Sequence, residues 1–264
     1  MDHLDALEAQ SVYILREAHA RFKRIGLLWS LGKDSNVMVW LARKAFFGHV
    51  PFPTLFCDTG KKFPEMYDFQ KRYSAEWGVN LVIENCPPIE EIDPTLPPAT
   101  RSAARKTEAL KRMIAKRDLD AVIAGIRRDE EGTRAKERVF SPRGEGAEWN
   151  FRDQPPEFWD QYKTNFPKGT HIRIHPILAW TELDIWRYIE RENIPIVQLY
   201  FSRHGKRYRS LGDHDITFPV NSEAATISEI IAELEATKIA ERSGRAMDQE
   251  AEDAFERLRT AGYM

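Results

Sequence analysis

A short polar stretch near the N-terminus, residues 29–35, carries residue types that bind phosphate. It reads Trp-Ser-Leu-Gly-Lys-Asp-Ser. Ser30 and Ser35 offer hydroxyl donors, Lys33 offers a cation, and Gly32 lets the backbone approach an anion without an intervening Cβ. An apolar run precedes the stretch and apolar residues at helical spacing follow it, which predicts a strand, a tight turn and a helix. The first N–H groups of such a helix lack partners in the chain and favour an anion above the strand.

The elements that must position this stretch alternate between strands and helices. The patterns predict strands over residues 25–29, 54–57, 80–84, 120–124 and 171–176, and helices over residues 4–22, 63–77, 101–116, 180–186 and 227–234. This alternation predicts an α/β fold with a doubly wound, mostly parallel sheet. We expect a nucleotide-binding domain over residues 1–200, and an irregular tail over residues 201–264 that covers the active site or contacts a partner.

Two further polar segments follow predicted strands. Asp58, Thr59 and Gly60 come after the second strand, at the carboxyl edge where open parallel sheets bind their ligands. Arg127 and Arg128 come after the fourth strand, and their forked guanidinium groups suit phosphate or sulfate oxygens. The alternative for the two arginines is an ordinary solvated loop.

Composition restricts the class of protein. The chain has 264 residues, 42% of them hydrophobic and 30% charged, with a net charge of −2, so we expect one sizeable α/β domain. No apolar run is long enough to span a bilayer and no signal-peptide pattern is present, which predicts a cytoplasmic protein. The near-neutral charge does not favour nucleic-acid binding. Cys57 and Cys86 are too few for an iron–sulfur cluster or a structural zinc site.

The stretch at residues 29–35 resembles the pyrophosphate-binding loop, Ser-Gly-Gly-x-Asp-Ser, of the ATP pyrophosphatase (PP-loop) superfamily, whose members cleave ATP between the α and β phosphates. From about Lys23 to the C-terminus, the chain resembles the small subunits of bacterial heterodimeric sulfate adenylyltransferases, in the PAPS-reductase branch of that superfamily. The other motifs that carry this resemblance are Asp-Thr-Gly at residues 58–60, Gly-Ile-Arg-Arg-Asp-Glu-Glu at 125–131, Arg-Ala-Lys-Glu-Arg at 134–138, Trp-Thr-Glu-Leu-Asp-Ile-Trp at 180–186 and Gly-Tyr-Met at 262–264.

The resemblance implies a reaction in which a sulfate oxygen attacks the α-phosphorus of ATP, giving adenosine 5′-phosphosulfate and pyrophosphate. It implies ATP with Mg²⁺ as ligands, and a GTPase large subunit as partner because the product anhydride lies uphill; self-association is left open. It places the pyrophosphate at Ser30, Gly32, Lys33, Asp34 and Ser35, with Asp34 reaching it through Mg²⁺, and the nucleoside near Asp58, Thr59 and Gly60. It places the α-phosphate and sulfate at Arg127 and Arg128, and it places Arg242 and Arg245 over the phosphates. Lys33, Arg127 and Arg128 are the expected catalytic residues.

Two positions depart from the resemblance. Leu31 replaces a glycine of the loop pattern, so if that glycine supplies a positive φ, we expect a remodelled loop and weaker affinity for the β and γ phosphates. Residues 211–217 read Leu-Gly-Asp-His-Asp-Ile-Thr, where the family has Leu-Gly-Cys-Trp-Pro-Leu-Thr-Gly, and the chain is shorter before this turn. We expect this change to affect the acceptor anion or the contact with a GTPase.

Three alternatives compete with sulfate adenylylation. A sulfonucleotide reductase would attack with a cysteine in its C-terminal segment, and this chain has no cysteine after Cys86. A thiolation enzyme would adenylate another acceptor, with Cys57 or Cys86 as the sulfur carrier. A nucleotide-binding regulatory subunit that has lost catalysis would tolerate Leu31.

Overall fold

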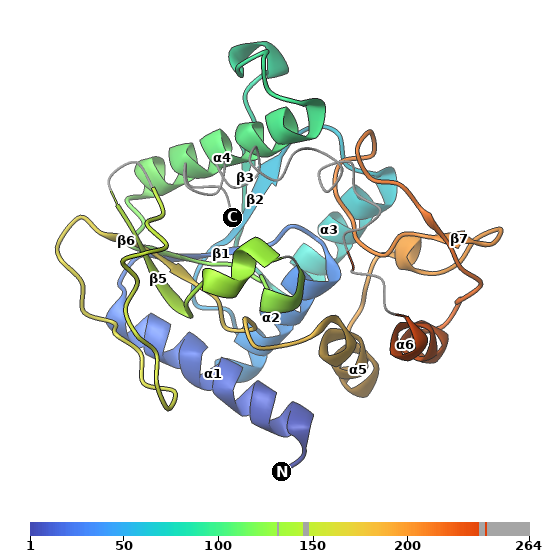
Figure 1. Ribbon diagram of the computed structural model, residues 1–264, viewed down its shortest axis with the longest axis horizontal. Coiled ribbons are helices and arrows are strands. Elements are labelled where there is room, and N and C mark those ends of the chain that lie inside the picture. Colours follow the sequence, from blue (N-terminus) through green and yellow to red (C-terminus); the bar gives the residue numbers. More distant parts are fainter. Residues whose placement is uncertain (131, 145–147, 238–240, 242–264) are drawn as a thin grey trace.

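A six-stranded sheet forms the centre of the computed structural model, which describes residues 1–130, 132–144, 148–237 and 241 (Figure 1). The strand order is β3-β2-β1-β4-β6-β5, and every neighbouring pair is parallel except β5 and β6. The strands are β1 Ile25–Leu28, β2 Thr54–Asp58, β3 Leu81–Asn85, β4 Ala121–Ile123, β5 Phe140–Arg143 and β6 His171–Ile174. The predicted α/β fold with a mostly parallel sheet is therefore confirmed.

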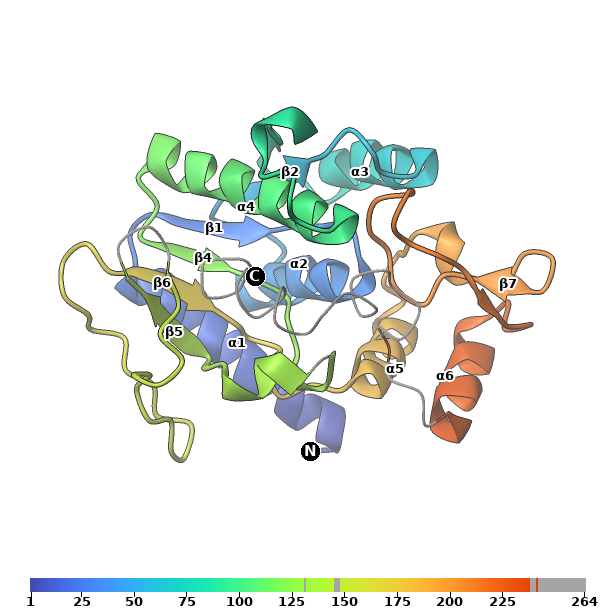
Figure 2. The ribbon, with the colours of Figure 1, turned by 45° about the horizontal axis from the view of Figure 1, so that its top comes forward.

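Helices cover both faces of this sheet. On one face α1 packs against α2, and α4 crosses the opposite face (Figure 2). All residues of β1 and β4 are buried, as strands covered on both sides require. The helices are α1 His3–Arg21, α2 Lys33–Ala45, α3 Pro64–Glu76, α4 Pro98–Arg117, α5 Glu182–Glu192 and α6 Ile227–Ala236. Among the described residues, no helix combines the length and apolar character needed to cross a bilayer.

The order of the strands fixes where a ligand can bind. From β1 the chain runs outward through β2 to β3, and it then returns to place β4 on the other side of β1. Beyond the carboxyl ends of β1 and β4 the sheet therefore has a topological switch point, the position at which open α/β sheets bind their ligands. The segments that follow β1 and β4 meet there, and both contain residues singled out from the sequence.

The C-terminal part continues from the sheet through α5. Thr181 caps this predicted helix, because its side chain accepts the Asp184 N–H while the Asp184 carboxylate accepts the Thr181 N–H. Helix α6 packs on α5, and a small two-stranded sheet of β7 Lys206–Arg207 and β8 Val220–Asn221 lies before it. The division at residue 200 stays a prediction.

In the central sheet, β5 is the strand that the sequence patterns did not predict, and the short strands β7 and β8 were not predicted either. Residues 140–143 form β5, antiparallel to β6, in a region whose sequence shows no clear period. Pro142 interrupts its pattern, and proline is tolerated here because β5 is the edge strand of the sheet.

Candidate active site

The predicted phosphate-binding loop of residues 29–35, called the phosphate loop below, leads directly from β1 into α2. Leu31 has a φ of 68°, and Gly32 is the N-cap of α2 with a φ of −75°. Leu31 thus adopts the left-handed conformation that glycine favours, and its side chain is fully buried in the hydrophobic core. Leucine therefore takes the positive φ itself, and burial of its side chain offsets the unfavourable backbone conformation; the expected remodelling of the loop and weaker phosphate affinity stay predictions.

Four hydrogen bonds hold this loop in place. The indole Nε1 of Trp29 donates to Asn36 Oδ1 at 2.7 Å, and Ser35 Oγ donates to the Gly32 carbonyl at 2.9 Å. Ser30 Oγ donates to Ser35 Oγ at 3.2 Å, and the Lys33 N–H donates to the hydroxyl of Tyr200 at 2.8 Å. The bond to Tyr200 ties the start of α2 to the segment that follows α5.

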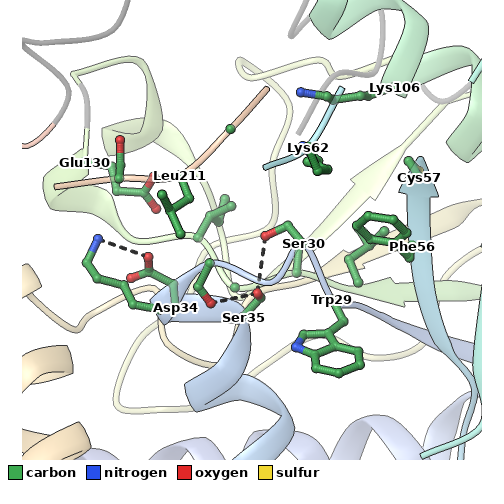
Figure 3. A pocket seen from close by; sticks show the side chains of 18 of the residues that line it. Trp29, Ser30, Asp34, Ser35, Phe56, Cys57, Lys62, Lys106, Glu130 and Leu211 are labelled. Carbon is green, nitrogen blue, oxygen red and sulfur yellow. Dashed lines mark hydrogen bonds and ion pairs between the residues drawn. The ribbon is translucent and has the colours of Figure 1, made fainter. Parts of the chain in front are cut away.

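A cavity opens above the loop at the switch point of the sheet (Figure 3). One wall is apolar and comes from the ends of β1, β2 and β4, and the other walls are polar and come from the loop, α4, the segment after β4 and the C-terminal part. The apolar lining residues are Leu28, Trp29, Leu55, Phe56, Cys57, Ala124, Ile126 and Leu211, and the polar ones include Ser30, Lys33, Asp34, Ser35, Lys62, Lys106, Glu130, Arg134, Tyr200, Ser210 and Glu241. The site thus offers an apolar surface beside a cationic one.

The first group of charges lies at the loop. Lys33 and Arg127 are both buried, and both ion-pair with the carboxylates of Glu241 and Asp34. Arg127 Nε also lies 2.9 Å from an oxygen of Asp129. Burial would raise the pKa of Glu241, but Lys33 and Arg127 outweigh burial and hold that pKa far below its usual range. Glu241 is therefore an anion bound by the same two cations that the sequence assigned to phosphate.

A second group of charges surrounds Asp213, whose side chain is fully buried. One oxygen of Asp213 lies 2.7 Å from Lys62 Nζ and 2.8 Å from Thr59 Oγ1. The other oxygen lies 2.9 Å from Lys106 Nζ and 2.5 Å from Ser102 Oγ. Burial would raise the pKa of Asp213, but Lys106 and Lys62 lower it well below the usual range.

Sequence reasoning missed this second group. Lys62 follows the Asp-Thr-Gly motif by two residues and could have been found as a cation at the carboxyl edge of β2. Arg134, which also lines the cavity, begins the family motif at residues 134–138, whereas Lys106 carried no signal beyond its place in a basic helix. Asp213 was noticed only as a departure from the family turn.

The predicted arginine pair is separated by the fold. Arg127 turns inward to the loop, but Arg128 is exposed, and its Nη2 donates to the Glu137 carbonyl at 3.2 Å. The described lining of the cavity includes neither arginine, but Arg127 pairs with Asp34 and Glu241, which both line it. Arg128 begins the 3₁₀ helix Arg128–Glu130. Its predicted contact with the acceptor anion stays a prediction.

The other predicted site residues are those that follow β2 and two arginines near the C-terminus. Asp58 accepts hydrogen bonds from the Gly60 N–H and the Tyr67 hydroxyl, and Thr59 donates to Asp213. These residues follow β2, but its contribution to the described lining of the cavity comes from the residues before Asp58. Their predicted contact with the nucleoside stays a prediction. Arg242 and Arg245 lie outside the described residues.

Neither cysteine is suited to act as a nucleophile. Burial raises the pKa of the Cys57 thiol to about 12 and that of Cys86 to about 11. The thiolate is the reactive form of cysteine, so both side chains stay protonated and inert near neutral pH. Cys57 contributes to the apolar wall instead.

Comparison with known proteins identifies the family. The family model of the phosphoadenosine phosphosulfate reductase domain matches residues 24–219. In an alignment 300 positions long, gaps included, the chain is 41% identical to the sulfate adenylyltransferase subunit 2 of Ectopseudomonas mendocina. The alignment covers 100% of this chain and 98% of that protein. It belongs to the sulfate adenylyltransferase subunit 2 family. The relative from Agrobacterium fabrum agrees, with 40% identity, 99% of this chain and 93% of that protein covered.

Membership of the sulfate adenylyltransferase subunit 2 family confirms the resemblance that the motifs indicated, and with it the class of nucleotidyltransferases.

Solved structures support the fold. FMN adenylyltransferase of Candida glabrata has a TM-score of 0.58 at 18% identity, covering 82% of this chain and 63% of that one. The phosphoadenylyl-sulfate reductase of Candida auris has a TM-score of 0.53 at 18% identity, covering 82% and 96%.

Proposed function

We propose that this chain transfers the adenylyl group of ATP to sulfate, giving adenosine 5′-phosphosulfate and pyrophosphate. The observation that carries the proposal is the phosphate loop at the switch point, where Lys33 and Arg127 bind a carboxylate in a chain of the sulfate adenylyltransferase subunit 2 family. A site that binds a buried carboxylate through two cations has the charge and donors that a phosphate group requires.

In this proposal the pyrophosphate part of ATP binds at the loop. The N-terminus of α2 supplies a positive dipole end, Ser30 and Ser35 supply hydroxyl groups, and Lys33 and Arg127 supply full charges. The negative charge that develops on the departing pyrophosphate is stabilised by groups already oriented before the reaction. No nucleophilic side chain is needed, because sulfate itself is the nucleophile and the protein contributes mainly positioning and electrostatic stabilisation.

The nucleoside is assigned to the apolar wall. Leu28, Leu55 and Phe56 border the cavity beside the loop, and an apolar surface suits a purine ring. The residues that follow β2 lie next to this wall, which supports a place for the nucleoside near residues 58–60 but leaves the direct contacts to Phe56 and Cys57.

Magnesium is assigned to the phosphates and Asp34. Mg²⁺ is usually held by one or two carboxylates together with substrate phosphates, and Asp34 is a carboxylate at the loop that lines the cavity. Among the described residues there is no group of three His, Cys, Asp or Glu side chains that could hold a metal alone, which fits an ion bound chiefly through ATP. When bound, the ion would neutralise phosphate charge.

Glu241 must give way when ATP binds in this arrangement. Its carboxylate pairs with Lys33 and Arg127, and a triphosphate placed at the loop would repel it. The tail over residues 201–264 is proposed to cover the site, which the presence of Ser210, Leu211 and Glu241 in the cavity wall supports. The binding of the phosphates by Arg242 and Arg245, one and four residues after Glu241 in the sequence, stays a prediction.

A GTPase large subunit is the proposed partner. The relatives are named as one subunit of a sulfate adenylyltransferase, which supports a second subunit. The phosphate–sulfate anhydride is less stable than the anhydride in ATP that it replaces, so hydrolysis of a second nucleotide would draw the reaction forward.

The experiment is formation of adenosine phosphosulfate from ATP and radiolabelled sulfate, with a family GTPase subunit and GTP supplied and pyrophosphate measured as the second product. We expect equal amounts of the two products. Lys33→Ala should weaken ATP binding in a calorimeter by about 1.5–3 kcal/mol, the range for one charge-assisted hydrogen bond. Release of orthophosphate from ATP in place of pyrophosphate, or unchanged ATP affinity in this variant, would contradict the proposal.

A further inference from the structure

The cavity has a second cationic end that the phosphate loop does not use. Lys62 and Lys106 both line the cavity, and Figure 3 shows them on the side of Ser30 that faces Cys57, away from Asp34 and Glu130. Lys33 belongs to the opposite, loop end, where Arg127 pairs with the lining residues Asp34 and Glu241. Arg134 also lines the cavity, but it pairs with Glu130 on the loop side.

We propose that Lys62 and Lys106 form the subsite for the acceptor oxyanion and that Asp213 is the positioning residue that holds them there. This inference rests on the proposed function, since it names the place of the acceptor in that reaction. The attacking and leaving oxygens lie roughly in line in phosphoryl-type transfer. With pyrophosphate leaving toward the loop, the acceptor must approach from the other side of the α-phosphorus, which is the side of these two lysines.

The position of Asp213 distinguishes it from a substrate ligand. Its side chain is fully buried, and the described lining of the cavity contains Ser210, Leu211 and Gly212 but not Asp213 itself. The carboxylate therefore lies behind the two ammonium groups, which themselves border the cavity. Each ammonium has three N–H donors, so an ion pair with one carboxylate oxygen is compatible with a contact to an anion on the cavity side.

Asp213 also makes the pair of lysines electrostatically possible. Two ammonium groups that share one carboxylate would repel each other without it. The Asp213 carboxylate binds one lysine through each oxygen, and the hydroxyls of Thr59 and Ser102 complete its hydrogen bonds. The cluster keeps a net charge of +1, which attracts an oxyanion.

Contacts within and next to the turn at residues 211–217 hold Asp213 in this position. A Cβ on Gly212 would lie 2.8 Å from Thr217 Oγ1, so a side chain there would push the turn open. His214 N donates to the Lys61 carbonyl at 2.8 Å, which ties the turn to the segment that carries Lys62. This backbone hydrogen bond thus joins the turn to the Lys62 segment directly beside the ion pair between Asp213 and Lys62.

The experiment is steady-state kinetics of the complex with its GTPase subunit, with inorganic sulfate varied at saturating ATP and ATP varied at saturating sulfate. Lys62→Gln and Lys106→Gln should each raise the KM for sulfate at least tenfold while the KM and Kd for ATP change less than threefold. Asp213→Asn should raise the KM for sulfate about fivefold, and combined with Lys106→Gln it should add little, because both act on the same contact.

Lys61→Gln is the matched control. Lys61 is the neighbour of Lys62 and also pairs with an aspartate, Asp215, at 2.6 Å, but both members of that pair are partly exposed. Its loss should leave both KM values within twofold. An equal rise of the ATP and sulfate constants in the Lys62 and Lys106 variants would assign these lysines to ATP and overturn the inference, whereas a wild-type complex that makes no adenosine phosphosulfate would refute the proposed function instead.

A second measurement needs only the wild-type protein, so it does not depend on the folding of a variant. Lys106 is 19% exposed at its side chain and can react slowly with acetic anhydride. In the presence of a non-hydrolysable ATP analogue, added inorganic sulfate should slow acetylation of Lys106 severalfold, as measured by peptide mass spectrometry, and should not slow that of Lys61. Equal rates at Lys106 with and without sulfate would contradict the acceptor subsite.

Discussion

Replacing Leu31 by glycine separates the two effects that this residue has on the phosphate loop. The backbone at Leu31 has a φ of 68°, which costs an L-residue about 1–2 kcal/mol and glycine almost nothing. The side chain is fully buried, and deletion of a buried leucine side chain costs about 2–5 kcal/mol. The second effect is larger, so we expect Leu31→Gly to destabilise the protein.

Leu31→Ala sets the scale for this prediction. Both variants lose the same core contacts, but alanine keeps the left-handed penalty, so Leu31→Gly should be the more stable of the two by about 1 kcal/mol. Leu27 is the matched control, because it is also fully buried but lies in β1 with extended backbone. At Leu27 the order should reverse, with the glycine variant less stable than the alanine variant.

The assay is urea unfolding followed by tryptophan fluorescence, with free energies obtained by linear extrapolation. A Leu31→Gly variant as stable as the wild type would show that the side chain adds nothing to the core. The same order of glycine and alanine at both leucines would refute the left-handed conformation at Leu31. Affinity for ATP should change little in Leu31→Gly, because glycine adopts the same backbone and presents the same N–H groups.

Three further predictions concern charge. Glu241→Gln should tighten the binding of inorganic pyrophosphate severalfold in a calorimeter, because a competing carboxylate is removed from Lys33; weaker binding would show that Glu241 orders the cation instead. Arg127→Lys should lower turnover at least tenfold, whereas the exposed neighbour variant Arg128→Lys should stay within twofold, and equal losses would refute the separation of the pair. Burial lowers the pKa of His175 from 6.5 to about 4. As the pH falls from 6.5 to 4, His175 is therefore protonated in the unfolded chain before it is protonated in the folded one, and the free energy of unfolding decreases by up to ~3 kcal/mol. In urea unfolding at pH 7.5 and pH 5, His175→Asn should reduce this loss, and an unchanged pH dependence would contradict it.

Local patterns allowed most of the fold to be predicted from the sequence. The strand, loop and helix around residues 25–45 have their own period and turn residues, and the cap of α5 is encoded by Thr181 and Asp184 three residues apart. The edge strand β5 lacked any such period because Pro142 interrupts it. It was therefore not among the predicted strands.

The site was only partly predictable because its charges come from distant segments. Lys33 was recognised within a local motif, but its partner Glu241 lies 208 residues further along the chain. Asp213 is separated from Lys62 by 151 residues and from Ser102 by 111, so nothing near any of them in sequence indicated their contact. Adjacent arginines show the converse: Arg127 and Arg128 look equivalent in the sequence, but in the fold Arg127 pairs with Asp34 of the loop, while Arg128 is exposed and donates to the Glu137 carbonyl.

The two buried carboxylates explain how a pocket for anions is stable in the absence of its ligands. Buried cations without partners are strongly unfavourable, and in this chain Glu241 pairs with both cations of the loop end while Asp213 pairs with both lysines of the other. Their positions give them different consequences for binding. Glu241 lines the cavity and, in the proposed function, must be displaced by a phosphate, whereas Asp213 is not part of the described lining and would stay when a ligand binds. Loss of Glu241 should therefore tighten the binding of anions, and loss of Asp213 should weaken it.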